Sequence, residues 1–181
     1  MDGNGSLDIV TGNFGQQNVV YLNNGGGIFT QIRPFGIGAD NTTSIAIGDV
    51  NDDGALDIVT GNSGQQNVVY LNDGSGNFYI GTVNCITSLA NVTCFGTGTD
   101  DTRSVTLGDI DSDGDLDIIT GNDRKQNIIY LNDGIARFNQ TRNFGTGSDR
   151  TWSLAVGDIN GDRYLDIVTG NAGQPKCSLS E

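Results

Sequence analysis

The chain repeats one short sequence at regular intervals. The heptapeptide LDIVTGN occurs at residues 7–13, 56–62 and 165–171, and its variant LDIITGN occupies residues 116–122. Successive copies are 49, 60 and 49 residues apart, and the 11-residue excess of the middle interval lies between Phe78 and Phe95. Sequence repetition at a period of ~20–50 residues is typical of folds in which like units stack and bury a shared core. The chain is therefore expected to be a series of equivalent units.

Each unit contains four apolar stretches that have the character of β-strands. The first stretch is represented by residues 43–49, 104–109 and 153–158, and the second is the heptapeptide itself. The third is represented by residues 17–23, 66–72 and 126–132, and the fourth by residues 28–36 and 137–145. These stretches are rich in Val, Ile, Thr, Tyr and Phe, and Gly, Asn or Asp turn residues separate them. Because no stretch of ten residues shows a helical period, the pattern disfavours a fold that alternates strands with helices.

Four antiparallel strands per ~40–50 residues are typical of β-propeller blades, whereas the coils of a β-solenoid are usually shorter, at ~20–30 residues. We therefore predict an all-β chain of propeller-type blades. The expected units are residues 1–42, 43–102, 103–151 and 152–181, with an insertion at about 80–94. Without the excess, 170 residues remain, or about 3.5 units of 49. The expected strand numbers of the four units are three, four, four and two.

The acidic residues are unusually uniform in type and position. The net charge is −13, and of 22 acidic residues only Glu181 is a glutamate. Fourteen of the aspartates lie in four segments, residues 1–8, 49–57, 109–117 and 158–166. An acidic chain is a poor partner for nucleic acid or an anionic membrane surface, since both select basic patches. Short carboxylates at fixed turn positions indicate metal coordination rather than a generally solvated surface.

The segment DVNDDGALD, residues 49–57, shows the spacing most clearly. Counting Asp49 as position 1, oxygen-bearing side chains occupy positions 1, 3, 5 and 9, position 7 offers its backbone carbonyl, and Gly54 at position 6 permits a sharp turn. Such a mixed oxygen set suits Ca²⁺, which takes 6–8 oxygen ligands, better than Mg²⁺. The candidate ligands are Asp49, Asn51, Asp53, Ala55 and Asp57; Asp109, Asp111, Asp113, Asp115 and Asp117; Asp158, Asn160, Asp162, Tyr164 and Asp166; and Asp2, Asn4, Ser6 and Asp8.

An EF-hand and a set of metal-free Asx-turns share parts of this spacing. An EF-hand needs a bidentate Glu at position 12 and flanking helices, but position 12 is Thr60, Thr120 or Thr169 and the flanks are strands. Asx-turns, in which Asp and Asn side chains bond their own backbone, need no metal. Convergence of several carboxylates without a cation would be repulsive, which weighs against Asx-turns alone.

The four segments are not equivalent. Residues 109–117 carry aspartate at every side-chain ligand position and should bind Ca²⁺ most tightly. Residues 158–166 carry Arg163 at position 6, which brings a positive charge and must adopt a conformation that Gly takes easily, so weaker binding is expected. Residues 1–8 lack the first ligand. The expectation is three calcium sites and a fourth, partial one.

Two motifs that recur in phase resemble a known family. The segments FGIGAD (35–40), FGTGTD (95–100) and FGTGSD (144–149), with the acidic segments that follow them, resemble FG-GAP and VCBS repeats. These repeats form blades of the integrin α-subunit propeller and of bacterial secreted proteins. The resemblance implies that the position-9 aspartate closes the calcium site. It also implies an extracellular or cell-surface location and a parent propeller of seven blades, of which this chain would be about half.

The resulting functional hypothesis is a calcium-stabilised extracellular module for adhesion or for recognition of a protein or carbohydrate. Its further partner would be the rest of a larger propeller or other copies in an oligomer. A structural spacer of a larger secreted protein is the alternative, and a carbohydrate-active enzyme using an Asp pair is less favoured. The sequence contains no His, which excludes Ser-His-Asp and Cys-His catalysis. It also contains no visible signal peptide and no apolar run of the ~18–20 residues that a spanning helix needs.

Three further features each allow two interpretations. Cys85 and Cys94 bracket the insertion and are either disulfide-bonded or free, while Cys177 has no partner in the sequence. The triplets that begin at Asn41, Asn91 and Asn139 fit the glycosylation sequon but arise readily by chance in an Asn- and Thr-rich repeat. The equivalent positions Thr43, Arg103 and Trp152 differ between repeats, which indicates either unconstrained drift or a partner surface anchored by Trp152.

Overall fold

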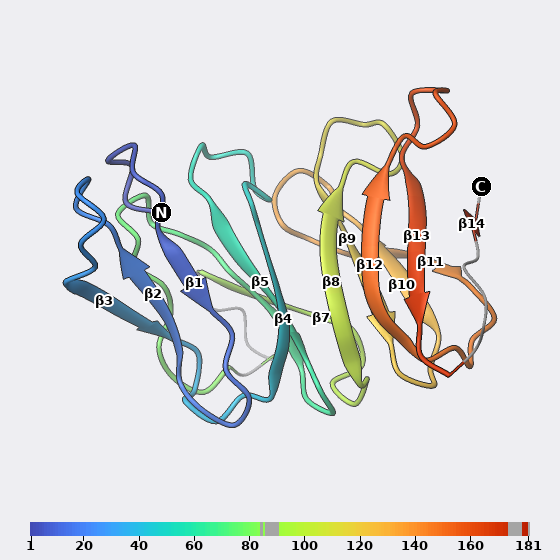
Figure 1. Ribbon diagram of the computed structural model, residues 1–181, viewed down its shortest axis with the longest axis horizontal. Helices are drawn as coiled ribbons and strands as arrows, with labels where there is room; N and C mark the ends of the chain where they lie inside the picture. Colours follow the sequence, from blue (N-terminus) through green and yellow to red (C-terminus); the bar gives the residue numbers. More distant parts are fainter. Residues whose placement is uncertain (84, 86–90, 174–178, 181) are drawn as a thin grey trace.

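The computed structural model describes residues 1–83, 85, 91–173 and 179–180, and within them the chain is all-β, with four antiparallel sheets (Figure 1). The first sheet contains β1 (Ile9–Thr11), β2 (Asn18–Leu22) and β3 (Gln31–Phe35). The second contains β4 (Thr42–Gly48), β5 (Asp57–Asn62), β6 (Asn67–Tyr70) and β7 (Val92–Phe95). The third contains β8 (Thr102–Gly108), β9 (Asp117–Asn122), β10 (Asn127–Leu131) and β11 (Gln140–Phe144). The fourth contains β12 (Thr151–Gly157), β13 (Asp166–Asn171) and β14 (Leu179–Ser180).

The observed sheets confirm the predicted all-β class and its propeller-type blades. Within each sheet the strands are paired in chain order, as consecutive antiparallel hairpins. Two details differ from expectation. The fourth sheet has a third strand, because Val168 pairs with Leu179 of β14. The expected insertion at 80–94 also overlaps β7, which begins at Val92 and supplies the fourth strand of the second sheet. The seven-blade parent ring stays a prediction.

The hydrophobic core is divided into layers between successive sheets. The first layer joins Val20 and Phe35 of the first sheet to Ile58 and Tyr70 of the second. The alternation of side chains along a strand then places Val59, the neighbour of Ile58, in the next layer with residues of the third sheet. A third layer joins the third sheet to Ile167 of the fourth. Each inner strand is therefore buried on both faces, which is why these strands are continuous apolar runs rather than alternating ones.

Glycines set how closely the sheets approach. A Cβ atom on Gly48 would lie 2.8 Å from Leu116 Cδ1, and one on Gly108 would lie 2.9 Å from Leu165 Cδ1. Both distances are shorter than real contacts, so the Leu of the heptapeptide in one blade occupies the space above a Gly of the preceding blade. The same packing contact between a Leu and a Gly thus recurs at two successive interfaces between units.

A buried polar chain also crosses each interface between sheets. Asn18 Nδ2 donates to Thr42 Oγ1 at 2.9 Å, and the Thr42 hydroxyl donates to Asn62 Oδ1 at 2.8 Å. The same relay runs from Asn67 through Thr102 to Asn122, and from Asn127 through Thr151 to Asn171. Because each side chain in a relay has a hydrogen-bond partner, these polar residues fix the register between blades at little energetic penalty.

The first strand of each of the last three sheets carries an irregularity near its start. The pairing register shifts between Thr42 and Ser44, between Thr102 and Ser104, and between Thr151 and Ser153. The residue left over at each shift belongs to the variable set Thr43, Arg103 and Trp152. A bulged residue is not held by the ladder, so its side chain is free to differ between repeats. Within the described residues no helix forms, and hence none is long and apolar enough to cross a membrane.

Candidate metal centre

Three of the four acidic segments lie in the turn between the first and second strand of a sheet. Residues 49–56 connect β4 to β5, residues 109–116 connect β8 to β9, and residues 158–165 connect β12 to β13. The remaining segment, residues 1–8, leads directly into β1. Because the hairpins are equivalent in neighbouring sheets, these turns gather at one end of the molecule, at the top of Figure 1. The repeat in sequence thus becomes a row of acidic loops in space.

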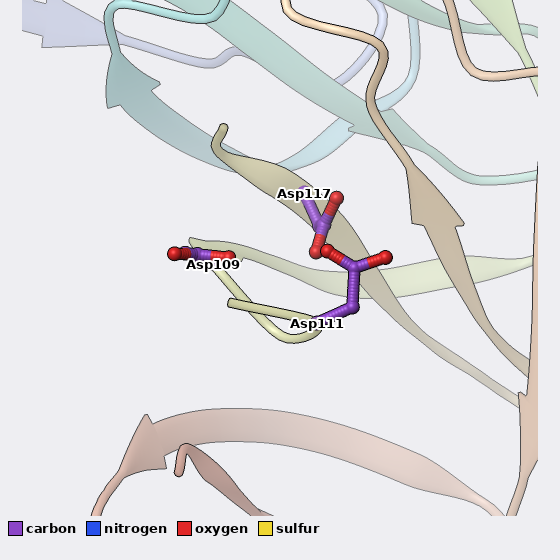
Figure 2. A group of neighbouring side chains, drawn as sticks. All are labelled: Asp109, Asp111 and Asp117. Atoms are coloured by element: carbon purple, nitrogen blue, oxygen red, sulfur yellow. The ribbon is translucent and has the colours of Figure 1, made fainter. Parts of the chain in front are cut away.

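The third loop brings three carboxylates together. Oxygen atoms of Asp109, Asp111 and Asp117 all lie within 4.8 Å of one another. Figure 2 shows Asp109 and Asp111 projecting from the loop and Asp117 from the start of β9. Ca²⁺ binds oxygen at 2.3–2.6 Å, so two ligands on opposite sides of the ion are separated by up to about 5 Å. The spacing and the all-oxygen donor set of these three residues therefore fit a calcium ion.

The position-9 aspartates are held differently from the other candidates. Asp117 is fully buried, and its Oδ2 accepts from Ile110 N at 2.9 Å while its Oδ1 accepts from Asn132 N at 2.9 Å. Asp57 makes the equivalent pair of bonds with Val50 N and Asn72 N, at 3.0 and 2.9 Å. One carboxylate thereby fastens the acidic loop to the end of the third strand. Each oxygen accepts only one of these bonds, which leaves a second lone pair for a cation.

Burial makes these carboxylates difficult to ionise. Burial and, to a smaller extent, the nearby charges of Asp53 and Asp49 raise the pKa of Asp57 to about 6, against two backbone hydrogen bonds that lower it. Burial also raises the pKa of Asp117. A cation at the loop would oppose both effects, because an opposite charge favours the ionised carboxylate.

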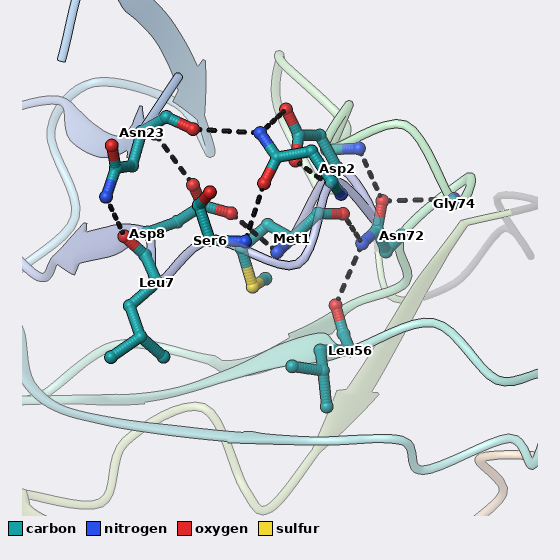
Figure 3. A network of polar contacts seen from close by, with 11 residues as sticks. Met1, Asp2, Ser6, Leu7, Asp8, Asn23, Leu56, Asn72 and Gly74 are labelled. Atoms are coloured by element: carbon teal, nitrogen blue, oxygen red, sulfur yellow. Dashed lines mark hydrogen bonds and ion pairs between the residues drawn. The ribbon is translucent and has the colours of Figure 1, made fainter. Parts of the chain in front are cut away.

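The Asn that partners each position-9 aspartate was missed by sequence reasoning. Asn72 Nδ2 donates to Leu56 O at 3.0 Å and to Met1 O at 2.8 Å, and Asn132 Nδ2 makes the matching bonds to Leu116 O and Val50 O. In the first blade Asn23 N donates to Asp8 Oδ1 at 2.8 Å (Figure 3). The available signal is the Asn that ends each YLN triplet, 15 residues after a position-9 aspartate in all three cases. A constant separation between two polar residues of neighbouring strands indicates such a contact.

The remaining loop side chains also bond their own backbone. Asp49 accepts from Asp53 N at 3.1 Å and from Gly54 N at 2.8 Å, and Asp109 accepts equivalently from Asp113 N and Gly114 N, both at 3.1 Å. Asp158 accepts from three successive amides, those of residues 161, 162 and 163. An Asx-turn bonds the backbone two residues on, whereas these bonds span three to five residues. They are compatible with a bound cation, since a carboxylate has about four acceptor sites.

Several candidate ligands lie outside the group of three. Asp113 Oδ1 accepts from Asp115 N at 3.0 Å, and the Asp115 carboxylate lies beside Gly134 of the neighbouring hairpin, 2.9 Å from where a Cβ would stand. Burial, together with the charges of Asp113 and Asp52, raises the pKa of Asp115. The position-7 residues Ala55, Tyr164 and Ser6 likewise donate their N–H to the side chain at position 5. In the N-terminal segment Asn4 bonds Asp2 at 3.1 Å rather than Asp8.

Each complete loop contains two residues in the left-handed region. Position 4 is Asp52, Ser112 or Gly161, with φ of 58°, 62° and 83°. Position 6 is Gly54, Gly114 or Arg163, with φ of 86°, 101° and 77°. The left-handed conformation expected of Arg163 is therefore observed. Sequence reasoning missed that position 4 also needs the left-handed conformation. The fourth loop has Gly161 at position 4 and Arg163 at position 6, so each complete loop has one non-glycine residue in the left-handed region.

The structure also shows the chemistry of the insertion. Cys85 and Cys94 form a disulfide with a Cα–Cα distance of 5.6 Å. Cys177 lies outside the described residues.

The Trp152 side chain is about half exposed, with the guanidinium carbons of Arg103 and Arg150 at 5.9 and 5.7 Å from its ring centroid. Arg150 is in turn paired with Asp123 at 2.9 Å, across the third and fourth sheets.

Comparisons with known proteins agree with the repeated loop-and-blade geometry. No curated protein matches the sequence significantly. The profile of the FG-GAP-like repeat matches three times, at residues 1–60, 49–120 and 109–169, so that the matches together span residues 1–169. Each match after the first begins at the first aspartate of an acidic loop, which makes that loop part of the family pattern. The chain belongs to the FG-GAP-like repeat family.

Proposed function

We propose that this β-propeller-type module binds Ca²⁺ in its acidic loops and serves as an extracellular recognition or adhesion scaffold. The observation that carries the calcium proposal is the convergence of Asp109, Asp111 and Asp117 within 4.8 Å in one turn. Three carboxylates so close together repel one another unless a cation or protons compensate them. The equivalent turns at 49–57 and 158–166 would hold further ions, with the position-7 carbonyl as an additional ligand.

The proposed role of calcium is structural. The ion would tie together the turn between the first and second strand, and the buried position-9 aspartate would transmit that constraint to the third strand. Extracellular calcium modules bind with dissociation constants of ~10⁻⁴–10⁻³ M, and a free ion concentration ten times the dissociation constant stabilises a site by roughly 1.4 kcal/mol. Several occupied sites would therefore contribute a substantial fraction of the stability of a small domain.

Calcium titration with thermal unfolding tests this role. We expect millimolar CaCl₂ to raise the Tm and EGTA to lower it again to the calcium-free value. MgCl₂ at equal concentration should have a smaller effect on the Tm. Isothermal titration should give about three sites. The double variant Asp111→Asn/Asp117→Asn should lose one of them. A Tm that is indifferent to calcium and to EGTA would overturn the proposal.

The recognition role is supported by the family and by the distribution of variable residues. FG-GAP repeats are typical of extracellular proteins, and the disulfide between Cys85 and Cys94 suits an oxidising compartment. The residues at the strand bulges, Thr43, Arg103 and Trp152, differ between repeats and are partly exposed, so their side chains are available to a partner. Binding to protein and glycan arrays, with and without calcium, tests this role.

Two alternative functions predict different experimental outcomes. A structural spacer would bind nothing on either array. A carbohydrate-active enzyme would turn over a glycoside and lose this activity on substitution of an aspartate outside the loops. The enzyme is less favoured because the aspartates outside the loops, such as Asp100 and Asp149, recur once per blade, whereas a catalytic pair is expected once per fold.

A further inference from the structure

The end of the molecule opposite the acidic loops contains two equivalent interfaces that differ in one cation. At the interface of the second and third sheets, Lys125 Nζ donates to Thr99 O at 2.7 Å and lies 3.4 Å from Asp100 Oδ1. Asp100 ends the FGTGTD segment and is 7% exposed. The ammonium group of Lys125 thus neutralises a buried carboxylate that belongs to the preceding blade.

The interface of the first and second sheets has the same carboxylate without the cation. Asp40 is equivalent to Asp100, and Gln65 is equivalent to Lys125. Gln65 reproduces the contact to the neighbouring carbonyl, since its Nε2 donates to Ala39 O at 3.4 Å, and its Oε1 accepts from Asn41 N at 2.6 Å. It does not supply a charge. Among the described residues, no Lys or Arg nitrogen lies within 4.0 Å of the Asp40 carboxylate.

A cavity of about 150 Å³ lies beside this carboxylate. Its polar lining includes Asp40, Gln65 and Tyr70, and its apolar lining includes Ile37, Val68 and Val83. A lining that combines a carboxylate with aliphatic side chains suits a ligand with a cationic head and an alkyl stem. Burial raises the pKa of Asp40, as expected of a desolvated carboxylate with no cationic partner.

The segment before the disulfide closes one side of the cavity, and the other repeats have no such segment. It is anchored to the first blade, because Gly36 N donates to Tyr79 O at 3.0 Å and Gly81 N donates to Gly36 O at 3.2 Å. Thr82 and Val83, the next two residues, line the cavity. The longest departure from the repeat therefore lies at the interface where the internal cation is missing.

We propose that the cavity between the first and second sheets binds a primary alkylammonium group, which supplies the positive charge that Lys125 supplies at the next interface. The ammonium would pair with Asp40, and its alkyl stem would contact the aliphatic wall. Charge-assisted hydrogen bonds to a partly desolvated carboxylate are about twice as strong as neutral ones. The group could be a free amine or a lysine side chain of a partner, and both present the same chemistry.

The cavity is independent of the calcium loops. It lies at the end of the strands remote from the acidic segments, one strand length away. Failure of amine binding would leave the calcium proposal intact, and failure of calcium binding would leave Asp40 and its cavity unchanged. Titrations are therefore made in a buffer of fixed calcium concentration.

The test is a titration of the full chain with n-butylammonium chloride, followed by NMR chemical shifts of backbone amides around Asp40. We expect saturable binding in the millimolar range, and no saturable binding of n-butanol, which has the same stem without the charge. N-acetyl-lysine methylamide separates the two sources, since it binds comparably only if the cavity accepts a lysine side chain. Equal shifts with n-butanol and n-butylammonium would overturn the proposal.

Matched variants use the internal control that the repeat offers. Asp40→Asn keeps the acceptor for the Ile37 amide and should weaken n-butylammonium binding at least tenfold. Gln65→Lys should also abolish binding, because the new side chain supplies the positive charge that Lys125 supplies at its own interface. Lys125→Gln is the control at the next interface and should not create a comparable site, because no described segment equivalent to residues 79–83 lines that interface. Unchanged affinity in both Asp40→Asn and Gln65→Lys would show that the ammonium binds elsewhere and would overturn the assignment.

Discussion

The loops at 109–117 and 158–166 have the same backbone path but reach it with different residues. In the third blade the left-handed positions are Ser112 and Gly114, whereas in the fourth they are Gly161 and Arg163. The Gly is at position 6 in the third loop and at position 4 in the fourth, so each loop has one non-glycine residue in the left-handed region. The two loops therefore bear similar backbone strain, and their difference lies in charge and in how deeply the position-9 aspartate is buried.

The position-9 aspartates show that second difference. Asp117 is fully buried and accepts from the amides of Ile110 and Asn132. Asp166 is 7% exposed and accepts from Ile159 N at 2.9 Å. The position-9 aspartate is therefore as much a clamp between strands as a candidate metal ligand, and in the third blade two backbone bonds form the clamp.

The largest expected effect comes from removing that clamp. Asp117→Ala leaves two buried N–H groups without acceptors, each of which costs about 1–3 kcal/mol. We expect a loss of about 2–5 kcal/mol in the free energy of unfolding, measured by urea denaturation in calcium-free buffer. Asp57→Ala removes the equivalent pair of bonds in the second blade and should lose a similar amount. A loss below about 1 kcal/mol in both variants would mean that this carboxylate is not a clamp.

Calcium affinity should distinguish the loops next. The third loop offers aspartate at positions 1, 3, 5 and 9, while the fourth has Asn160 at position 3 and a positive charge at position 6. We expect the third loop to bind Ca²⁺ about tenfold more tightly, a difference of about 1.4 kcal/mol. Asp111→Ala should remove the tightest event in a calorimetric titration, and Asn160→Ala a weaker one. If Asn160→Ala removes the tightest event, the order of the loops is reversed.

The smallest expected effect separates strain from charge at Arg163. An L-residue in the left-handed conformation is about 1 kcal/mol less stable than Gly, so Arg163→Gly should stabilise the metal-free protein by about that amount. Arg163→Ala is the matched control, because it removes the charge and keeps the strained φ. Both variants should raise calcium affinity, but only Arg163→Gly should raise the metal-free Tm. A similar Tm increase in both variants would assign the effect to charge.

Much of the fold could be predicted from the sequence because the residues of one packing contact recur along the chain. Leu116 and Leu165, each at the head of a heptapeptide, lie against Gly48 and Gly108, each just before an acidic loop. The recurrence of this Leu and Gly in phase predicted like units that stack. The fourth strand of the second blade was the weak point. Its sequence is separated from β6 by the insertion, so no local pattern marked Val92 as its first residue.

The candidate metal site was predicted as a set of positions but not as an arrangement. The spacing of DIDSDGDLD identified Asp109, Asp111 and Asp117, which converge. It could not reveal that Asp115 turns toward Gly134 or that Asn132 holds Asp117, because both contacts join residues about 15 or more positions apart. Long-range contacts of this kind leave no periodic signal within a single loop.

The sequence by itself determined the all-β class, the number of units and the location of the acidic turns. The reason is that hydrophobic period and turn chemistry depend on a few neighbouring residues, and these residues recur in each repeat. Only the tertiary structure decided which side chains share a site. The comparison of Asp40 with Asp100 depends on Gln65 and Lys125, which reach across an interface toward the preceding blade. Whether a buried charge is paired is a property of that interface, and a local pattern does not encode it.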